Sequence, residues 1–402
     1  MRILLVTQYF YPENFKGNDI AFELVKRGHH VDVLTGMPNY PDGVYRKGYG
    51  IFKKRVETIG GVHVYRVFQF PRGKNSKLMM ILNYVSFPIF ASLDCLLFLA
   101  WKKYDIIIVQ QLSPIFQAFP AVLMRKIKNI PLYMWILDIW PNALQSAAGI
   151  RNERIIGAVN RFVHFIYRNC DKLLISSHRF APLINTKKDY SDKIIYFPNW
   201  SDDILQMDDS YKIPQLPKGF KIMIAGNLGK SQNLEAITDV MLGLKDIPEV
   251  KWIFVGGGSR KEWLEDFIKE HELEEIAMCV GQYPFNAMPA FYKQADAMLV
   301  TLRAGFPHLE AVVPARLQSY MSAGKPVLAM IGCGGADIIK ESQCGYAVPA
   351  GDSKALIKII KEKVLNNKDS FRKMGKNGRD YYTMNYRMDT CIDNLETIIG
   401  AK

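Results

Sequence analysis

Short apolar runs alternate with longer amphipathic stretches along most of the chain. A continuous apolar run is typical of a strand buried on both faces, and such runs occupy residues 1–6, 31–34, 106–109, 132–137 and 173–176. Residues 19–27 have the spacing of an amphipathic helix that ends at Gly28. Because strands that alternate with helices form parallel sheets, we predict a doubly wound α/β domain over residues 1–200.

The same pattern restarts after a polar, proline-bearing stretch at 198–218, which we interpret as a linker. Five strands are expected beyond it, at 221–225, 251–255, 277–279, 297–301 and 326–330. The helices between them are expected at 234–244, 261–271 and 287–294 and after Pro314. The fold class is therefore α/β, with a second Rossmann-like domain over 201–380 and a C-terminal helix over 381–402 that we expect to pack back towards the first domain.

Residues 78–101 form one long apolar segment with basic residues on both flanks, namely Arg72, Lys74, Lys77, Lys102 and Lys103. The segment has the length of a membrane span, but Asn83, Pro88 and Asp94 interrupt it, and an Asp at mid-bilayer costs about 3 kcal/mol. Three interpretations stay open: a span, a helix pair docked into the membrane surface, and a buried core element. We favour peripheral attachment.

The net charge of +13 lies in the first half of the chain, where residues 1–200 carry 27 Lys and Arg against 13 Asp and Glu. Because this charge accompanies the apolar segment, we expect an anionic membrane surface as partner and no nucleic acid. Residues 1–6 do not have the composition of a secretory signal, so we expect a cytoplasmic protein on the inner face of the cell membrane. Neither the six cysteines nor the seven histidines have metal-ligand spacing, and no metal site is expected.

The loops that follow strands are the candidate binding sites, because ligands of open α/β sheets bind beyond the carboxyl ends of the strands. Three such loops are rich in glycine or precede a helix start, at 226–232, 256–259 and from Gly305 to Pro314. No capping side chain precedes Pro314, so an anion could satisfy the free amides there, and Arg316 adds a fixed charge. Neither a G-x-x-x-x-G-K-[ST] loop nor a G-x-G-x-x-G fingerprint occurs, so kinase-type and NAD-binding sites lose support.

In the first half, the loops at 14–19 and 36–41 supply Gly17, Asn18, Asn39 and Tyr40 as acceptor-side candidates. Asp138 follows a predicted strand beside Trp140, a pair that could hold a sugar hydroxyl and stack on the apolar face of the ring. The alternative, that Asp138 only caps the next turn, stays open. We interpret His29, His30 and His164 as structural.

Six stretches resemble the family 4 retaining glycosyltransferases of GT-B fold, and within them the bacterial surface-polysaccharide branch with transferases likened to the L-fucosamine transferases of O-antigen and capsule assembly. They are QYFYPEN at 8–14, the stretch from 27 to 43, DIWP at 138–141, FPNW at 197–200, GNLGKSQNLE at 226–235 and VPARLQSYMSAGKPVLA at 313–329. The resemblance implies a nucleotide-sugar substrate, UDP-linked, held by the second domain, and a polyprenyl diphosphate-linked saccharide acceptor held by the first. The donor sugar is expected to be a hexose or an N-acetylated deoxyamino sugar, and no cofactor is implied.

Carried over by position, the resemblance gives a donor site of Gly226, Asn227, Gly229, Lys230, Gln232, Gln282, Tyr283, Pro314, Ala315 and Ser319. Catalytic roles fall on Arg316, Asp138 and Glu310. Many family members have two glutamates where this chain has Ala311 and Ser319, and Glu310 lies one place away from the first. Lys230 and Arg316 are therefore expected to meet most of the leaving-group charge without a metal, and no residue stands out as a covalent nucleophile.

Two other functions remain open from the sequence. A sugar-phosphate isomerase of similar fold would use the same loops, although a soluble substrate needs no membrane face. A non-catalytic lipid-binding relative is favoured if Ala311 and Ser319 mean that donor binding is lost.

Overall fold

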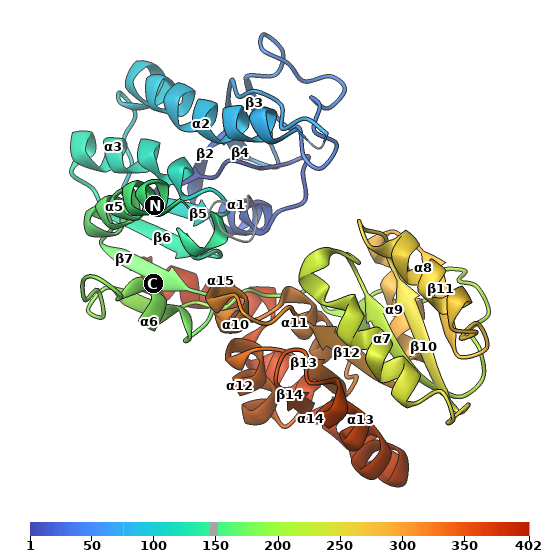
Figure 1. Cartoon of the computed structure of the whole chain (residues 1–402). Coiled ribbons are helices and arrows are strands. Elements are labelled where there is room, and N and C mark those ends of the chain that lie inside the picture. Colours follow the sequence, from blue (N-terminus) through green and yellow to red (C-terminus); the bar gives the residue numbers. More distant parts are fainter. Residues whose placement is uncertain (75, 145–151, 402) are drawn as a thin grey trace. The chain divides into compact units, whose positions relative to one another are not determined.

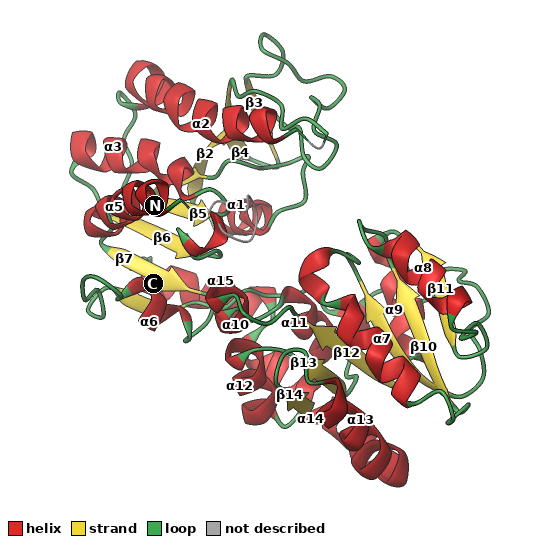
Figure 2. Ribbon diagram, viewed as in Figure 1, coloured by secondary structure: helices red, strands yellow, loops and turns green. Residues whose placement is uncertain are grey.

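The computed structural model describes residues 1–74, 76–144 and 152–401, and it divides into two compact units with one sheet each (Figure 1). The first unit consists of Met1–Ser176, Phe180–Phe197 and Ile392–Lys402, and the second of Ser177–Arg179 and Pro198–Cys391. Figure 2 shows the strands of each unit between helices, as a doubly wound α/β fold requires. The predicted α/β fold class is confirmed.

The sheet of the first unit has eight strands in the order β3-β4-β2-β1-β5-β6-β7-β8. In chain order they are β1 (Arg2–Val6), β2 (His30–Gly36), β3 (Val56–Ile59), β4 (Val62–Val67), β5 (Ile106–Gln111), β6 (Leu132–Ile136), β7 (Lys172–Ile175) and β8 (Ile194–Tyr196). All neighbours pair in parallel except β3 and β4. All six residues of β5 are buried, as its apolar run predicts.

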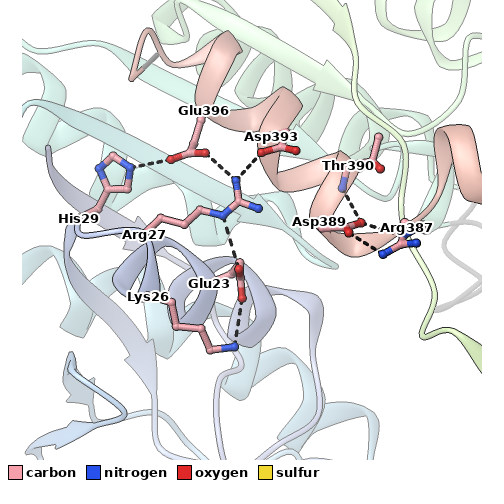
Figure 3. Close-up of polar contacts among 9 residues, drawn as sticks. All are labelled: Glu23, Lys26, Arg27, His29, Arg387, Asp389, Thr390, Asp393 and Glu396. Carbon is pink, nitrogen blue, oxygen red and sulfur yellow. Dashed lines mark hydrogen bonds and ion pairs between the residues drawn. The ribbon is translucent and has the colours of Figure 1, made fainter. Parts of the chain in front are cut away.

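The helices of the first unit are α1 (Lys16–Lys26), α2 (Lys77–Asp94), α3 (Phe119–Lys128), α5 (Glu153–Asn169), α6 (Phe180–Ile184) and most of α15 (Met388–Ile398). Crossovers between parallel strands are right-handed. The crossovers that contain α2, α3 and α5 each step along the sheet in the direction of β8, so these three helices cover one face. The crossover that contains α1 steps in the opposite direction, from β1 to β2, so α1 covers the other face. Helix α15 joins this unit at the end of α1, where Glu396 accepts a hydrogen bond from Arg27 and pairs with His29 (Figure 3).

Two expectations for these helices were wrong. Helix α1 begins at Lys16 and not at residue 19, so Gly17 and Asn18 lie in its first turn and not in a loop. The apolar segment is one helix and not a helix pair: α2 runs through Pro88 and continues as a π-helical turn at Cys95–Leu99. In the turn after Pro88, Ser92 Oγ donates to the carbonyl of Pro88 (2.6 Å).

The sheet of the second unit is parallel throughout, in the order β11-β10-β9-β12-β13-β14. Its strands are β9 (Phe220–Ala225), β10 (Val250–Val255), β11 (Ala277–Gly281), β12 (Ala297–Thr301), β13 (Val327–Met330) and β14 (Gly345–Val348). The helices are α7 (Leu234–Gly243), α8 (Lys261–Glu270), α9 (Met288–Gln294), α10 (Pro307–Ala311), α11 (Ala315–Ser322), α12 (Cys333–Ser342), α13 (Ser353–Ile359) and α14 (Lys368–Asn385).

Each face of the second sheet has its own apolar core. One core joins the sheet to α9, α11, α12 and α14, and the other joins it to α7, α8 and α13. Shorter turns complete the chain: 3-10 turns at Ile115–Ala118, Ile204–Gln206, Lys230–Gln232, Phe285–Ala287 and Leu365–Asn367, and a π-helical turn at Ile360–Val364. The carboxyl ends of the strands are thereby left as the open edge of the sheet.

Candidate functional site

The glycine loops of the second unit pack directly on one another at the carboxyl ends of β9 and β10. The amide of Gly226 donates to the carbonyl of Val255 (2.8 Å), and the amide of Leu228 donates to the carbonyl of Gly257 (2.8 Å). A Cβ on Gly256 would lie 1.9 Å from the carbonyl oxygen of Gly226, so only glycine fits there. The two loops therefore pack closely through their main-chain atoms at this edge of the sheet.

Arg316 extends over this surface from the first turn of α11. Its Nη2 donates to the carbonyl of Asn227 (3.3 Å) and would lie 3.4 Å from a Cβ placed on Gly226. Its Nη1 is buried and has no hydrogen-bond partner among the described residues. Helix α11 has no side-chain cap, and Pro314 is its N-cap residue and not part of the first turn as we expected. The arrangement offers a fixed cation and unpaired donors to an anion.

The remaining donor-side candidates of the glycine loops line the same edge. Lys230 is exposed in a 3-10 turn, while Gln232 is buried and its Oε1 has no partner among the described residues. Gly229 is buried, and a Cβ there would lie 2.9 Å from the side-chain nitrogen of Asn227. Gln282 reaches the second glycine loop, because its Oε1 would lie 3.2 Å from a Cβ on Gly257.

Three further candidates lie beside this edge. The ring of Tyr283, next along the chain from Gln282, packs edge-on against Phe291 with centroids 4.8 Å apart. Ala315 is exposed at the start of α11. Ser319 lies one turn further on and has its Oγ buried, so the position where related proteins have a glutamate holds only a small hydroxyl group here.

Glu310 precedes Arg316 along the chain and lies on a short helix of its own. We expected a loop from Gly305 to Pro314, but the helix α10 forms there and carries Glu310. The carboxylate accepts a hydrogen bond from the amide of Gly305 (3.1 Å), which closes the turn before α10. Glu310 also lines a cavity of about 470 Å³ together with the segments that follow β13 and β14. A small polar group could occupy this cavity.

In the first unit, the predicted acceptor-side asparagines are used to hold loops. Asn18 accepts from the amide of Tyr11 (2.9 Å) and donates to the carbonyl of Glu13 (2.7 Å), and Asn39 is likewise buried and hydrogen-bonded. Gly17 is buried and packs closely against Gln110: a Cβ at this position would lie 2.3 Å from the Gln110 side chain. These three residues therefore hold the fold of this region, and their place at the acceptor site stays a prediction.

Glu13 organises this region, and our sequence analysis did not single it out. Its Oε1 accepts from the amides of Asn39 (2.6 Å) and Tyr40 (2.5 Å). Burial raises the pKa of Glu13 to about 7, although these amide hydrogen bonds oppose the rise. The only available signal was its place in the QYFYPEN stretch.

Trp140 and Asp138 are joined through Ser113. Trp140 is buried, packs on Phe116 with centroids 5.7 Å apart, and donates to Ser113 Oγ (3.0 Å), and its contact with a sugar stays a prediction. Ser113 in turn donates to Asp138 Oδ2. Burial raises the pKa of Asp138 to about 6, while the hydrogen bonds from Ser113 and Ile139 lower it. Asp138 is therefore a carboxyl group that can change protonation near neutral pH.

Arg72 lies among tyrosines just before α2. Its guanidinium carbon is 5.9 Å from the ring centre of Tyr40 and 5.6 Å from that of Tyr84. Burial raises the pKa of Tyr84, Arg72 lowers it, and Asp138 raises it, so Arg72, Tyr84 and Asp138 share one neighbourhood. Arg72 makes no ion pair with a carboxylate among the described residues. The side chain of Tyr40 beside it is 43% exposed. The sequence had marked Arg72 only as a basic flank of the apolar segment.

The apolar segment exposes one face of its helix. Leu78, Ile81, Val85, Ile89, Leu93, Leu96, Leu97, Phe98 and Trp101 are all exposed, with Trp101 at 84%. We call these nine residues the apolar stripe. The opposite face is buried and includes Asn83, which is hydrogen-bonded, while Asp94 pairs with Arg55 (2.6 Å). Residues Lys77–Leu99 are long and apolar enough to cross a membrane by length and composition alone, and 28% of their most apolar window is buried.

No group of three or more His, Cys, Asp or Glu residues that could hold a metal ion occurs within 1–74, 76–144 and 152–401. Charge at the candidate donor edge therefore comes from Arg316, from Lys230 and from main-chain amides.

Two sequence families match the chain. The family "Glycosyl transferase 4-like domain" matches residues 18–200, and the family "Glycosyl transferases group 1" matches residues 208–381. The two matches together cover most of the chain and meet close to the boundary between the units.

Curated relatives are distant. A putative colanic acid biosynthesis glycosyltransferase, WcaL of Escherichia coli, is 20% identical over 47% of each chain. The amylovoran biosynthesis glycosyltransferase AmsK of Erwinia amylovora is 27% identical over 27% of each chain. The chain thus spans half or less of the length of these relatives. An uncharacterized glycosyltransferase of Methanocaldococcus jannaschii is 22% identical over 87% of this chain and 85% of its own.

Solved structures match over the whole chain. The sucrose-phosphate synthase of Thermosynechococcus elongatus has a TM-score of 0.76 at 16% identity, with 100% of this chain and 98% of that one covered. Anabaena HepE in complex with UDP has a TM-score of 0.72 at 15% identity, with both chains covered completely. At this identity the likeness shows the fold, which is GT-B.

Proposed function

Since the chain belongs to the glycosyltransferases built from a transferase 4-like domain and a group 1 domain, we propose that it moves a sugar from a UDP-sugar to a lipid-linked saccharide. The sugar is a hexose or an N-acetylated deoxyamino sugar, and the acceptor is carried on polyprenyl diphosphate. The reaction retains the configuration of the anomeric carbon and serves bacterial surface polysaccharide synthesis. The names of WcaL and AmsK, which refer to colanic acid and amylovoran, support this assignment.

The observation that carries the proposal is the position of Arg316. A guanidinium with a buried nitrogen that has no partner among the described residues lies over two glycine-rich loops, whose main-chain atoms a ligand can approach closely. A diphosphate fits these donors, because an arginine fork and main-chain amides are the usual partners of phosphate oxygens. The structure of HepE in complex with UDP supports uracil as the base. A sugar-phosphate isomerase loses support, because both matched families are glycosyltransferases.

We assign the chemical step to charge stabilisation. As the bond to the UDP leaving group breaks, negative charge develops on the diphosphate, and Arg316, Lys230 and the glycine-loop amides meet it. Asp138 and Glu310 are the candidate acids, Asp138 towards the acceptor and Glu310 towards the donor. No covalent nucleophile is assigned, so the acceptor hydroxyl attacks from the side that the leaving group vacates.

We also propose peripheral attachment to the inner face of the cell membrane. The apolar stripe of α2 is exposed to solvent along its whole length, which costs free energy unless a partner covers it. Basic residues lie at both ends of this helix, so a lipid surface with anionic head groups fits both features. A lipid-linked acceptor would then already be at the enzyme's surface.

The test is a mass-spectrometric screen of purified full-length protein with a panel of nucleotide-sugars and polyprenyl diphosphate-linked acceptors. We expect one UDP-sugar to give a glycosylated lipid. Calorimetry with UDP alone separates the two parts of the proposal: UDP binding without transfer supports the donor site and shifts the search to other acceptors. Absence of UDP binding, with binding of another nucleotide or of none, contradicts the UDP assignment.

A further inference from the structure

A second cavity, of about 370 Å³, lies in the first unit between α5 and the segment that precedes β8, and cations surround it. We propose that this cavity is a binding site for an anion that carries two or more phosphate groups. Its positive lining consists of Arg161 and Arg168 from α5 and of Lys187 and Lys188 from the facing segment. None of these residues belongs to the donor or acceptor sites, so the inference stands independently of the proposed function.

The charge around the cavity is not neutralised within the protein. No carboxylate lines the cavity, and none of its four cations forms an ion pair with a described acid. The acid next to it in sequence, Asp189, is occupied: its Oδ1 accepts from the amide (2.9 Å) and the hydroxyl (2.6 Å) of Ser191. Four like charges around one small volume repel one another, and a bound polyanion relieves that repulsion.

The floor of the cavity is a fixed aromatic pair. The rings of His164 and Tyr190 stack at 5.8 Å with an interplanar angle of 17°, and His164 Nδ1 is 3.0 Å from the Tyr190 hydroxyl. Tyr190 is buried, and the ammonium of Lys188 lies 5.8 Å from its ring. Burial, Lys187 and Arg168 all lower the pKa of His164. A bound anion would oppose this shift and favour the protonated form of the imidazole.

Size and donor type favour a compact polyphosphate group over a saccharide. The volume is at the lower end of the range for ligand sites, about 300–1,000 Å³. Arginine binds phosphate with two parallel hydrogen bonds and lysine with a single strong charge, and the cavity has two of each. Such a group can come from a soluble polyphosphate or from the head groups of an anionic lipid surface. The position of α5 agrees with a lipid source. Helix α5 packs against α3, and both helices cover the same face of the sheet as α2, which carries the apolar stripe.

The site can be tested on the full-length protein with inorganic tripolyphosphate while UDP saturates the donor site. The readout is the pH titration of the His164 ring by NMR, which reports this cavity alone. We compare the wild type with Arg161→Gln/Lys188→Gln and with a matched control, Arg2→Gln/Lys26→Gln, which removes one exposed Arg and one exposed Lys elsewhere in the first unit. We expect tripolyphosphate to raise the pKa of His164 in the wild type and the control, and to bind the cavity variant at least tenfold more weakly.

Vesicles identify the source of the phosphate. Hydrogen exchange of 160–168 and 185–190 is measured with phosphatidylglycerol vesicles and with neutral phosphatidylcholine vesicles. Protection by phosphatidylglycerol that the cavity variant loses and the control retains assigns the phosphates of neighbouring lipid head groups, and a response to tripolyphosphate alone assigns a soluble anion. The proposal is overturned if neither probe changes His164 or these segments, or if the two double variants respond equally.

Discussion

At the scale of single residues, Arg316 is the side chain on which donor binding depends most. Replacing Arg316 with Ala removes a charge-assisted contact worth about 1.5–3 kcal/mol, so we expect UDP affinity to fall about tenfold to a hundredfold. The fold should persist, because Arg316 is only partly buried and its one described hydrogen bond is long (3.3 Å). Calorimetric titration with UDP measures the change.

The control is Arg372→Ala, which removes an exposed arginine from α14 in the same unit. Its UDP affinity should equal that of the wild type. If Arg316→Ala binds UDP as tightly as Arg372→Ala does, the anion site does not lie at the start of α11.

The leaving group should need no divalent cation, because Arg316, Lys230 and main-chain amides supply its positive partners. We expect transferase activity to be unchanged after the protein is dialysed against EDTA. Addition of magnesium or manganese to the dialysed enzyme serves as the comparison. A strict requirement for either ion would show that the side chains alone do not stabilise the leaving group.

Glu13 makes the stability of the first unit depend on pH. Its pKa is about 7 in the fold, above the usual value near 4.5, so the folded unit binds an extra proton between these values. Stability therefore falls as pH rises from about 4.5 to 7, by roughly 3 kcal/mol at most. Glu13→Gln keeps an acceptor oxygen for the Asn39 and Tyr40 amides and removes the titration.

The comparison is made with urea denaturation of wild type and Glu13→Gln at pH 5 and pH 8. Relative to the wild type, the variant should gain stability between pH 5 and pH 8. The exposed substitution Glu153→Gln is the control and should show no such gain. An equal pH dependence in wild type and Glu13→Gln would mean that Glu13 is already ionised at pH 5.

Residue roles were the hardest part to predict from sequence. Arg316 and the glycine loops were recognisable, because glycine after a strand and a charge in a first helical turn have direct physical meaning. The roles of Asn18, Asn39 and Trp140 were harder to predict, because a polar or aromatic side chain after a strand can bind a ligand or satisfy a neighbouring loop. In the structure each of these side chains makes a hydrogen bond within the first unit.

At the scale of elements, burial on both faces determined which strands could be predicted. The continuous apolar runs of β1, β5, β6 and β9 were identified because strands buried on both faces are apolar at almost every position. Strands β3 and β4 were missed: β3 lies at the edge of the sheet and has no buried residue, and β4, between β3 and β2, mixes buried and exposed positions. Strand β14 begins with a glycine and has only four residues, and it gave no signal either.

The prediction at this scale concerns the binding of the apolar stripe to lipid vesicles. Leu97 and Trp101, in and just after the π-helical turn that continues α2, are 63% and 84% exposed, so replacing both with Gln should leave the core intact and place two polar side chains in the apolar stripe. We expect binding to vesicles with anionic lipid to weaken by at least tenfold. Leu205→Gln/Met384→Gln, two equally exposed apolar residues of the second unit, should bind like the wild type.

The salt dependence of vesicle binding measures its electrostatic part apart from the insertion of apolar side chains. Each basic residue near an anionic surface contributes about 1 kcal/mol, but Lys102 is already paired with Asp32 (2.8 Å) and Arg72 is partly buried. Lys74, Lys77 and Lys103 remain exposed. Binding should therefore decrease with salt, less steeply than five free charges would give. Equal sedimentation with neutral and anionic vesicles would contradict the electrostatic part.

At the scale of the whole molecule, the last residues of the chain belong to the first unit, although the chain has by then completed the second. Helix α15 carries Glu396, which is almost completely buried and accepts from Arg27 Nη1 (2.6 Å) while facing His29 Nε2 (3.0 Å) (Figure 3). Asp393 also accepts from Arg27 (2.7 Å) but is 55% exposed. One arginine therefore has a buried and an exposed carboxylate partner on the same helix.

This arrangement gives a matched pair of substitutions. Glu396→Ala leaves Arg27 without its buried partner and should cost the first unit about 3–5 kcal/mol of unfolding free energy. Asp393→Ala removes a solvent-exposed partner of the same guanidinium and should cost less than about 1 kcal/mol. Hydrogen exchange of peptides from β1 and β2, with peptides from β9 and β10 as the internal reference, measures both. If α15 stabilises the first unit through Glu396, exchange in β1 and β2 accelerates in Glu396→Ala alone and β9 and β10 stay protected. Equal effects of the two substitutions would show instead that the buried position of Glu396 gives its ion pair no advantage over the exposed one.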